Sequence, residues 1–330
     1  MEPIIRLLRA RGKNRLADCI EKNEQKPVRG YSKELNSYSP ARPLELEMKD
    51  AFRKELFRLG VEKTDKILES LERRRILQTA PHLGATENPR MLAINWLGSL
   101  GVPDNEFYVV GMYSGIPFSN NSRPGRINRR EESINLFPSS MQDDLVYGSK
   151  IPEKLVEVVK TLPEPLKKLL PNAKMGDSYS KWALTVCGNI ERKILGKENL
   201  IYLDINEVVA NYMDEIKKKP GHPMNKIREL NEANLFLAFA PLLFNHFKCF
   251  GSFRQVEYLP EYQEKLSGLG FMKEFEVEKV PTASLTTGEF KNKPYPVDII
   301  LGEEFTPNPQ MLFGEFITNM MTKEWLEKHI

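Results

Sequence analysis

The spacing of hydrophobic residues predicts helices in the first part of the chain. In residues 45–60, apolar side chains recur at helical spacing, and Gly60 is placed to end that helix. Residues 64–75 repeat the pattern and predict a second helix. We therefore expect residues 1–75 to form a helical N-terminal extension.

After residue 75, short runs of branched and aromatic residues alternate with helical patterns. Residues 75–80 predict a strand, 89–101 a helix, and 106–115 a second strand. Such a strand–helix–strand unit is typical of parallel sheets. We predict an α/β fold whose Rossmann-like parallel sheet core spans residues 76–330. Further strands are expected at 199–204, 246–253 and 296–305, and a helix from residue 254 is expected to be interrupted at Pro260.

Composition narrows the class of protein. The chain has 330 residues, of which 41% are hydrophobic and 28% charged, as in globular proteins, and the net charge of +3 does not favour nucleic-acid binding. The longest apolar run, residues 235–244, is too short to span a bilayer, and the N-terminus lacks a signal-peptide core. The cysteines Cys19, Cys187 and Cys249 are odd in number and widely spaced, which favours free thiols. We expect a cytoplasmic protein with no membrane or nucleic-acid partner, and a homodimer is left open.

The loop at 79–89 is the first candidate for chemistry, because loops that follow strands in α/β sheets usually hold ligands. His82 lies in this loop, and its ordinary pKa of about 6.5 suits acid–base work at neutral pH. A packing or surface histidine is the alternative.

Two basic features could hold an anion. The segment "RPGRINRR" at 123–130 offers Arg123 and Arg126 for a carboxylate or phosphate, or else forms a solvated loop. "AKMGDS" at 173–178 resembles the lysine loop of adenylylating class I synthetases, and "PHLG" resembles their histidine loop. A solvated Lys174 before a helix cap is the alternative there. A zinc site at His246 and Cys249 is disfavoured, because no paired ligand motif completes it.

Taken in order, these pieces resemble the core domain of the cysteine-adding enzymes of bacillithiol biosynthesis. Residues 80–82, Gly84 and Asn88-Pro89 match the spacing of that family's Gly-Gln-Gln loop and its following glycine and Gly-Pro pair. Gly111 matches the glycine that ends the next strand. "FGSFRQVEY" resembles the family's glycine-rich turn, with Gln255 in the acidic position and Tyr258 matching its tyrosine. The resemblance covers patches of residues 75–270 and implies a Rossmann-like core.

The chain also departs from that family. Met112, Tyr113 and Ser114 stand where the family has an acidic Glu-Asp-His stretch, and Pro81 and His82 replace its loop glutamines. No segment matches its long coiled coil. The resemblance therefore implies the fold more than the reaction, and His82 is the candidate to replace the missing histidine.

We expect a small-molecule biosynthetic enzyme, ligase- or transferase-like, that joins an amine- or thiol-bearing substrate to a second metabolite. The alternatives are a nucleotide-dependent adenylylating enzyme, which would use ATP with His82 and Lys174, and a non-catalytic binding or scaffold protein on the same fold. No metal is expected. The predicted site residues are His82, Tyr113 and Tyr258 for catalysis, Thr79, Gly84, Asn88, Ser114, Asn120, Arg123, Arg126, Gly251, Ser252 and Gln255 for substrate, and Lys174 for a cofactor.

Overall fold

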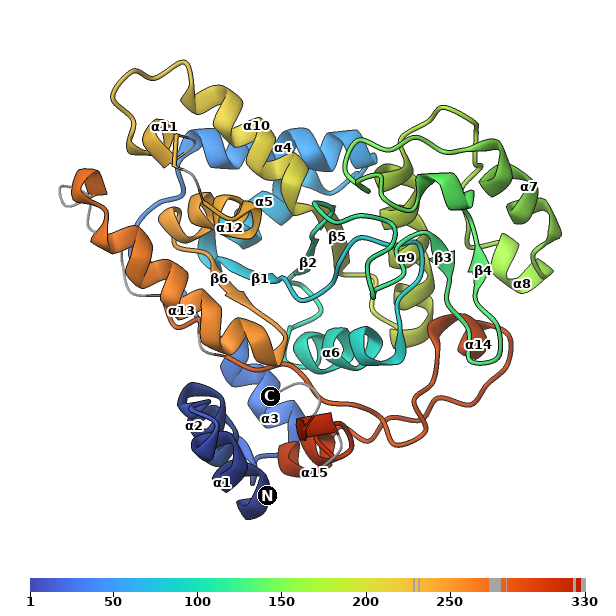
Figure 1. Ribbon diagram of the computed structural model, residues 1–330, viewed down its shortest axis with the longest axis horizontal. Coiled ribbons are helices and arrows are strands. Elements are labelled where there is room, and N and C mark those ends of the chain that lie inside the picture. The colour runs from blue at the N-terminus through green and yellow to red at the C-terminus, as the bar shows by residue number, and fades with distance from the viewer. Residues whose placement is uncertain (228, 231, 273–279, 283, 323–324, 328–330) are drawn as a thin grey trace.

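The computed structural model in Figure 1 is a mixed α/β structure, with helices on both sides of a central sheet. It describes residues 1–330 apart from 228, 231, 273–279, 283, 323–324 and 328–330. The helices are α1 (Glu2–Ala10), α2 (Asn14–Asn23), α3 (Val28–Leu35), α4 (Leu46–Leu59), α5 (Thr64–Arg73), α6 (Pro89–Ser99), α7 (Glu153–Thr161), α8 (Glu164–Lys167), α9 (Tyr179–Leu195), α10 (Ile205–Ile216), α11 (Pro223–Ile227), α12 (Asn234–Phe244), α13 (Phe253–Gly268), α14 (Pro296–Ile300) and α15 (Phe313–Thr318), with 3-10 turns η1 (Ser139–Met141) and η2 (Gly270–Met272).

Four parallel strands form the central sheet in the spatial order β5–β2–β1–β6. Their bounds are β1 (Ile76–Gln78), β2 (Tyr108–Met112), β5 (Leu200–Asp204) and β6 (Lys248–Phe250), and a separate antiparallel pair joins β3 (Arg126–Ile127) to β4 (Ile134–Asn135). This arrangement confirms the predicted α/β fold with a Rossmann-like parallel sheet. Because all four strands run in one direction, their carboxyl ends meet at a single edge of the sheet.

Both faces of the sheet are covered, so its strands are apolar at successive positions. In β2, Val109 faces a core that it shares with α4, α5, α10 and α12, whereas Val110 faces a core shared with α9. β5 repeats this alternation, with Leu203 on the first side and Tyr202 on the second. The continuous apolar runs seen in the sequence follow from this two-sided burial.

The N-terminal helices contribute to two different cores. α4 and α5 pack directly on the sheet, whereas α1, α2 and α3 pack with α6 and α15. The N-terminal and C-terminal regions also exchange backbone hydrogen bonds, because Val28 N donates to Met311 O (2.9 Å) and Phe313 N donates to Lys26 O (2.9 Å). The first 75 residues are therefore helical, as predicted, and are packed against the rest of the chain.

Two predicted details are wrong. Residues 296–300 form α14 and not a strand, since Pro296 occupies the first turn, where proline favours a helix start, and Val297 is buried in the core that includes α9. The helix expected to be interrupted at Pro260 runs through it as α13. Within the described residues, no helix is long and apolar enough to cross a membrane.

Candidate functional site

Polar residues follow the strands at the carboxyl edge of the sheet. Thr79 follows β1, Tyr113 and Ser114 follow β2, and Asp204 is the last residue of β5. Gly251 follows β6. Ligands of open α/β sheets usually bind outside this edge, so it is the place to examine for chemistry.

His82 extends the line of β1 and lies beside Tyr113. The two residues form a parallel β-bridge, and their ring centroids are 6.3 Å apart. His82 Nδ1 lies 3.3 Å from Asn120 Oδ1, which also accepts the backbone N–H of Ser122 at 2.9 Å. Because that oxygen is an acceptor, Nδ1 carries the hydrogen and Nε2 has the lone pair. Burial lowers the pKa of His82, and the bond to Asn120 opposes this shift. The imidazole is therefore neutral at pH 7 and able to accept a proton at Nε2.

Ser114 links the ends of β2 and β5. Its hydroxyl lies 2.8 Å from Asp204 Oδ1 and 3.1 Å from Asn206 Oδ1, and its backbone N–H donates to the same Asn206 oxygen at 3.0 Å. A hydroxyl has one proton and here faces two acceptor oxygens. A protonated Asp204 resolves this conflict, because the carboxyl then donates to Ser114 Oγ and Ser114 donates to Asn206.

The surroundings of Asp204 favour that protonated form. Its side chain is fully buried, and burial raises the pKa of Asp204 to about 7, while the Ser114 bond lowers it and Glu55 raises it. Asp204 Oδ2 has no hydrogen-bond partner. Glu55 is itself buried and held by Arg58 through bonds of 2.6 and 2.8 Å, and it accepts the backbone N–H of Asp204 at 3.0 Å. The buried surroundings of Asp204 thus favour its protonated form far more than water would.

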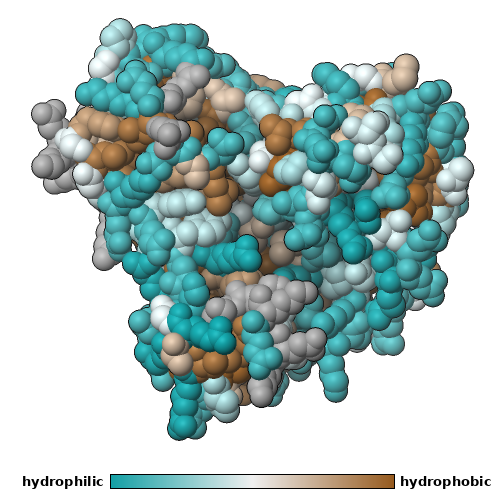
Figure 2. Space-filling view, in the orientation of Figure 1, coloured by the Kyte–Doolittle hydropathy of each residue, from teal (hydrophilic) through white to brown (hydrophobic). Residues whose placement is uncertain are grey.

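A cavity of about 380 Å³ lies over the carboxyl ends of β2 and β5. Its wall is largely apolar and comes from α10, α12 and the loop that carries Leu145 and Tyr147, and Figure 2 shows hydrophobic surface gathered over the region of α12. Tyr113 and Asn206 supply polar groups to the lining. They flank Gly115, where a Cβ would lie 2.5 Å from the Tyr113 hydroxyl and 3.2 Å from Asn206 Nδ2. The volume falls within the range of about 300–1,000 Å³ usual for small-molecule pockets.

The strand order places its point of reversal between β1 and β6, where ligands of such sheets commonly bind. In this protein that place is filled by side chains. Gln255 Nε2 donates to Thr79 O at 2.7 Å, and Thr286 N donates to Gly251 O at 2.9 Å. A Cβ on Gly251 would lie 2.4 Å from Gln255 Oε1 and 2.6 Å from the Ala80 methyl group. The cavity accordingly lies over β2 and β5.

The predicted site residues fall into separate bonded groups. The structure joins His82 with Tyr113 and Asn120, and it joins Thr79 with Gln255. Ser114 belongs to the Asp204 group described above. Tyr113 and Ser114 are consecutive in the chain, so the first group adjoins the Asp204 group, but within the described residues no hydrogen bond between the named side chains joins the three groups. Their action at one cleft stays a prediction.

Three predicted binding residues have structural roles at turns. Asn88 caps α6, its Oδ1 accepting backbone N–H groups at 3.0 and 3.1 Å from the next two non-proline residues. Gly84 is buried against Pro124, whose Cα would lie 3.3 Å from an added Cβ. Ser252 precedes α13 as its N-cap residue. The contacts of Asn88 and Gly84 account for these two residue types without a ligand, whereas the Ser252 side chain makes no capping hydrogen bond.

The arginine-rich segment lies at the surface. Arg123 is exposed and has a left-handed backbone (φ 56°), and Arg126 is half-buried in β3. Arg129 pairs with Asp298 at 3.0 Å and so ties this segment to α14.

Lys174 and Tyr258 make no contact with His82 within the described residues, and Tyr258 is instead hydrogen-bonded to Gln255. Lys174 is exposed in the turn before α9. Tyr258, on α13, packs against Tyr262 and Phe239 at centroid distances of 5.1 and 6.2 Å. No contact between His82 and Lys174 therefore supports the alternative of an adenylylating enzyme that uses both residues.

Sequence reasoning missed Asp204 and Asn206. The signal was an aspartate that ends the apolar run "NLIYLD" at the edge already selected for ligands. An aspartate at this position is equally typical of a residue that caps the following helix. Its side chain does cap α10, because it accepts the Asn206 N–H at 2.9 Å.

A second buried carboxyl group lies between α6, α9 and the sheet. Glu191 Oε2 accepts from Asn95 Nδ2 at 3.0 Å and from the Tyr202 hydroxyl at 2.5 Å. Burial raises the pKa of Glu191 to about 7, and the two bonds oppose the shift. Burial and then the charge of Glu191 raise the pKa of neighbouring Glu87. Neither glutamate lines the cavity over β2 and β5.

The remaining candidates for metal or thiol chemistry are buried cysteines. Cys19, Cys187 and Cys249 are free and buried, as predicted, and Cys249 lies within β6. Across the described residues, no group of three or more His, Cys, Asp or Glu side chains is placed to hold a metal ion.

Comparison with protein-family models, with curated proteins and with solved structures finds no match to this chain. The case for a function therefore depends on the geometry of the carboxyl edge.

Proposed function

We propose that this protein is a small-molecule enzyme that joins an amine- or thiol-bearing substrate to a second metabolite at the carboxyl edge of the sheet. The observation that carries the proposal is the cavity over β2 and β5, in which Asn206 is bonded to the buried pair of Ser114 and Asp204. A buried carboxyl group with a raised pKa thus lies two hydrogen bonds, through Ser114, behind a ligand-sized cavity.

The lining defines the class of substrate. Val209, Ala210 and Met213 offer apolar contact from α10, while Tyr113 and Asn206 offer hydrogen bonds. We expect one substrate to have an apolar body with one or two polar groups at its inner end, since apolar walls with few polar groups are usual for metabolite pockets.

In the joining reaction, the amine or thiol forms its new bond to an electrophilic carbon of the second metabolite as the bond from that carbon to its leaving group breaks. The nucleophile gives up a proton in this step, and the departing group can take that proton up. The neutral imidazole of His82 is suited to accept that proton at Nε2, and it adjoins Tyr113, which lines the cavity. Asp204 would act through Ser114 and Asn206, as a positioning residue that holds the polar groups of the lining in place.

Filling the cavity tests the proposal. We would measure thermal stability and binding heat with amines, thiols, amino acids, sugar phosphates and ATP, because a ligand at about 100 times its Kd adds roughly 2.7 kcal/mol of stability. Ala210→Trp places an indole in the cavity from α10 and should remove binding of any ligand held there. Asp214→Trp is the matched control, since Asp214 is exposed on the same helix and outside the lining.

Each outcome has a distinct meaning. Loss of binding in Ala210→Trp with retention in Asp214→Trp supports this cavity as the site, and a joined product from paired ligands supports the reaction. Binding of the ligands without any product favours the binding-protein alternative. Equal binding by wild type and Ala210→Trp would overturn the assignment of the cavity.

A further inference from the structure

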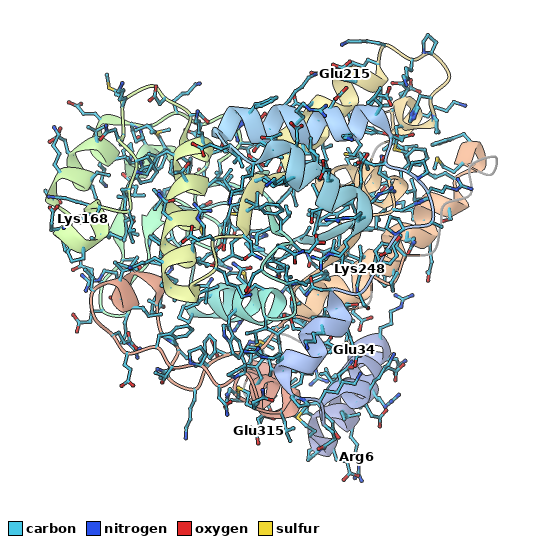
Figure 3. The ribbon with its side chains drawn as sticks, turned by 180° about the vertical axis from the view of Figure 1, so that it is seen from behind. Arg6, Glu34, Lys168, Glu215, Lys248 and Glu315 are labelled. Carbon is cyan, nitrogen blue, oxygen red and sulfur yellow. The ribbon has the colours of Figure 1, made fainter. Side chains whose placement is uncertain are left out.

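A larger cavity, of about 760 Å³, lies at the opposite edge of the sheet. Lys248, the first residue of β6, lines it together with residues of α2, α3 and the segment that follows α3. Since Lys248 begins its strand, this is the amino edge, away from the carboxyl edge that carries Ser114 and Asp204. Figure 3 shows Lys248 and Glu34 near each other on neighbouring elements, with Lys168 on the far side of the molecule.

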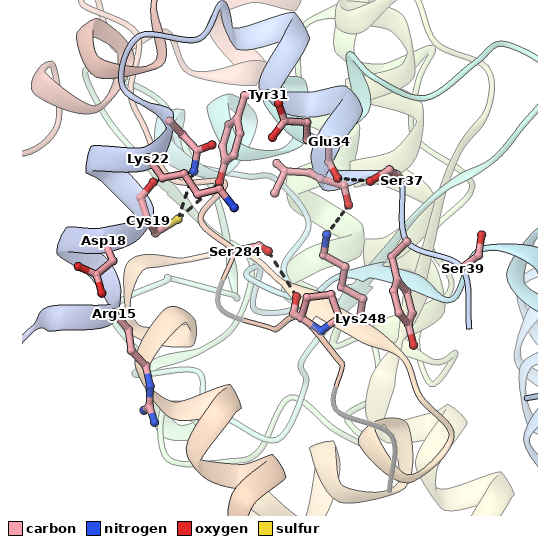
Figure 4. A pocket seen from close by; sticks show the side chains of 14 residues that line it. Arg15, Asp18, Cys19, Lys22, Tyr31, Glu34, Ser37, Ser39, Lys248 and Ser284 are labelled. Atoms are coloured by element: carbon pink, nitrogen blue, oxygen red, sulfur yellow. Dashed lines mark hydrogen bonds between the residues drawn. The ribbon is translucent and has the colours of Figure 1, made fainter. Parts of the chain in front are cut away.

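Lys248 is a buried cation at this cavity. The residue is 5% exposed, and its Nζ donates one recorded hydrogen bond, of 2.7 Å, to the backbone oxygen of Leu35. Figure 4 shows the side chain extending toward α3 among the residues that line the cavity. An ammonium group has three donors, so two remain for a ligand. Within the described chain, no carboxylate is recorded in an ion pair with Lys248.

The acidic residues of the lining are paired elsewhere. Asp18 bonds Arg9 at 2.9 Å, and Glu34 bonds Lys26 at 2.5 Å. Neither Arg9 nor Lys26 lines the cavity, so both acids are committed to partners outside it.

The basic residues of the lining are only partly paired. Arg15 bonds Glu264 at 3.1 Å. Lys22 is exposed at the cavity and, like Lys248, has no recorded ion pair among the described residues. The lining thus has two positive charges that its own acids do not neutralise.

The Leu35 bond and the Phe250 ring, 5.8 Å from Nζ, compensate only part of the hydration that the Lys248 ammonium loses, because neither carries a negative charge. An anion in the cavity would offset that cost by accepting the free donors of Lys248. The hydroxyl groups of Tyr31, Ser37 and Ser39, also in the lining, can serve the rest of a polar ligand.

We propose that the cavity at the amino edge is a second ligand site, which takes a small metabolite whose carboxylate or phosphate is bound by Lys248. The proposal is independent of the function assigned to the carboxyl edge, because it uses none of the same residues. Burial lowers the pKa of Lys248 to about 8, which leaves the amine largely protonated at pH 7 and able to bind an anion.

Calorimetric titration with simple anions tests this site. Sodium phosphate and sodium succinate serve as separate probes against sodium chloride at matched ionic strength. Binding of phosphate alone assigns a phosphate ligand, and binding of succinate alone assigns a carboxylate. Lys248→Met should raise the Kd of whichever anion binds at least tenfold. Lys168→Met removes an exposed lysine on the far side of the molecule and should leave that Kd unchanged.

Two further measurements protect the test against misfolding of the variant. Lys22→Met alters an exposed residue, so it should fold normally and weaken the same probe. Carbamylation of Lys248 in the wild type, followed by mass spectrometry, should slow when the probe is present. The proposal is wrong if neither anion binds more strongly than chloride, or if folded Lys248→Met binds the probe as the wild type does.

Discussion

The two buried carboxyl clusters differ in their surroundings more than in their chemistry. Asp204 and Glu191 are both fully buried, and burial raises the pKa of each to about 7. Asp204 is bonded to Asn206, which lines a cavity, whereas Glu191 is bonded to the buried side chains of Asn95 and Tyr202. A raised pKa therefore reports burial, and the adjoining cavity is what makes Asp204 a candidate for chemistry.

The largest effect on turnover is expected from changing His82, which neighbours the Asp204 cluster through Tyr113. His82→Ala should reduce turnover by about 10²–10⁴-fold with the fold intact, since positioned proton transfer contributes about that much. His82→Gln should bind substrate nearly normally and fail in turnover if a proton must move. Steady-state kinetics with a substrate found by the binding screen provides the measurement. Full turnover by His82→Ala would move the catalytic assignment to Tyr113 or Tyr258.

Asp204→Asn should show the next largest effect. We expect a loss of about 10²-fold in kcat/KM, the low end for proton transfer, because Asp204 acts through Ser114 and Asn206. The pH profile of kcat/KM should also lose an ionisation near 7. Glu191→Gln is the matched control and should retain both the rate and the profile. Equal losses in the two variants would contradict the distinction between the clusters.

Glu191 should also contribute to how stability depends on pH, together with Asp204 and Glu87, whose pKa values burial raises as well. Its folded pKa of about 7 exceeds the ordinary value of 4.5, so its contribution is complete below pH 4.5 and is lost as the pH rises through 7. Between pH 4.5 and 8 the free energy of unfolding should fall by about 3 kcal/mol through this residue. Glu191→Gln keeps the shape of the protonated acid and should make the fall in stability less steep, while Asp204 and Glu87 still contribute. Urea unfolding at several pH values measures this, and an unchanged slope in Glu191→Gln would contradict it.

The last prediction, with the smallest expected effect, concerns whether solvent reaches the interior around Glu191. Cys187 is buried on the same helix, and the charge of Glu191 adds to the burial that raises the pKa of Cys187. A thiol reagent should react with neither Cys187 nor Cys249 in the native protein and with all three cysteines in denaturant without reductant. Rapid native reaction at Cys187 would mean that solvent reaches this cluster as it reaches the cavity.

The local spacing of apolar residues was enough to predict most of the strands. Apolar runs with glycine or proline boundaries correctly placed β1, β2, β5, β6 and the helix α6 between β1 and β2. The segment at 296–300 failed because its branched residues suit a strand, while Pro296 at the helix start and the burial of Val297 favoured a helix. Propensity is weak in so short a segment, and packing decided it.

The sequence alone determined that this protein has a parallel sheet and that polar residues gather at its carboxyl edge, because periodicity and strand ends are local properties. Tertiary structure decided which of those residues meet. Ser114 and Asp204 are 90 positions apart, and Lys248 and Leu35 are 213 apart. No spacing in the chain encodes such pairs, since they arise only when strands and helices distant in sequence pack together. The same packing fills the space between β1 and β6, leaves a cavity over β2 and β5, and buries a lysine at the opposite edge.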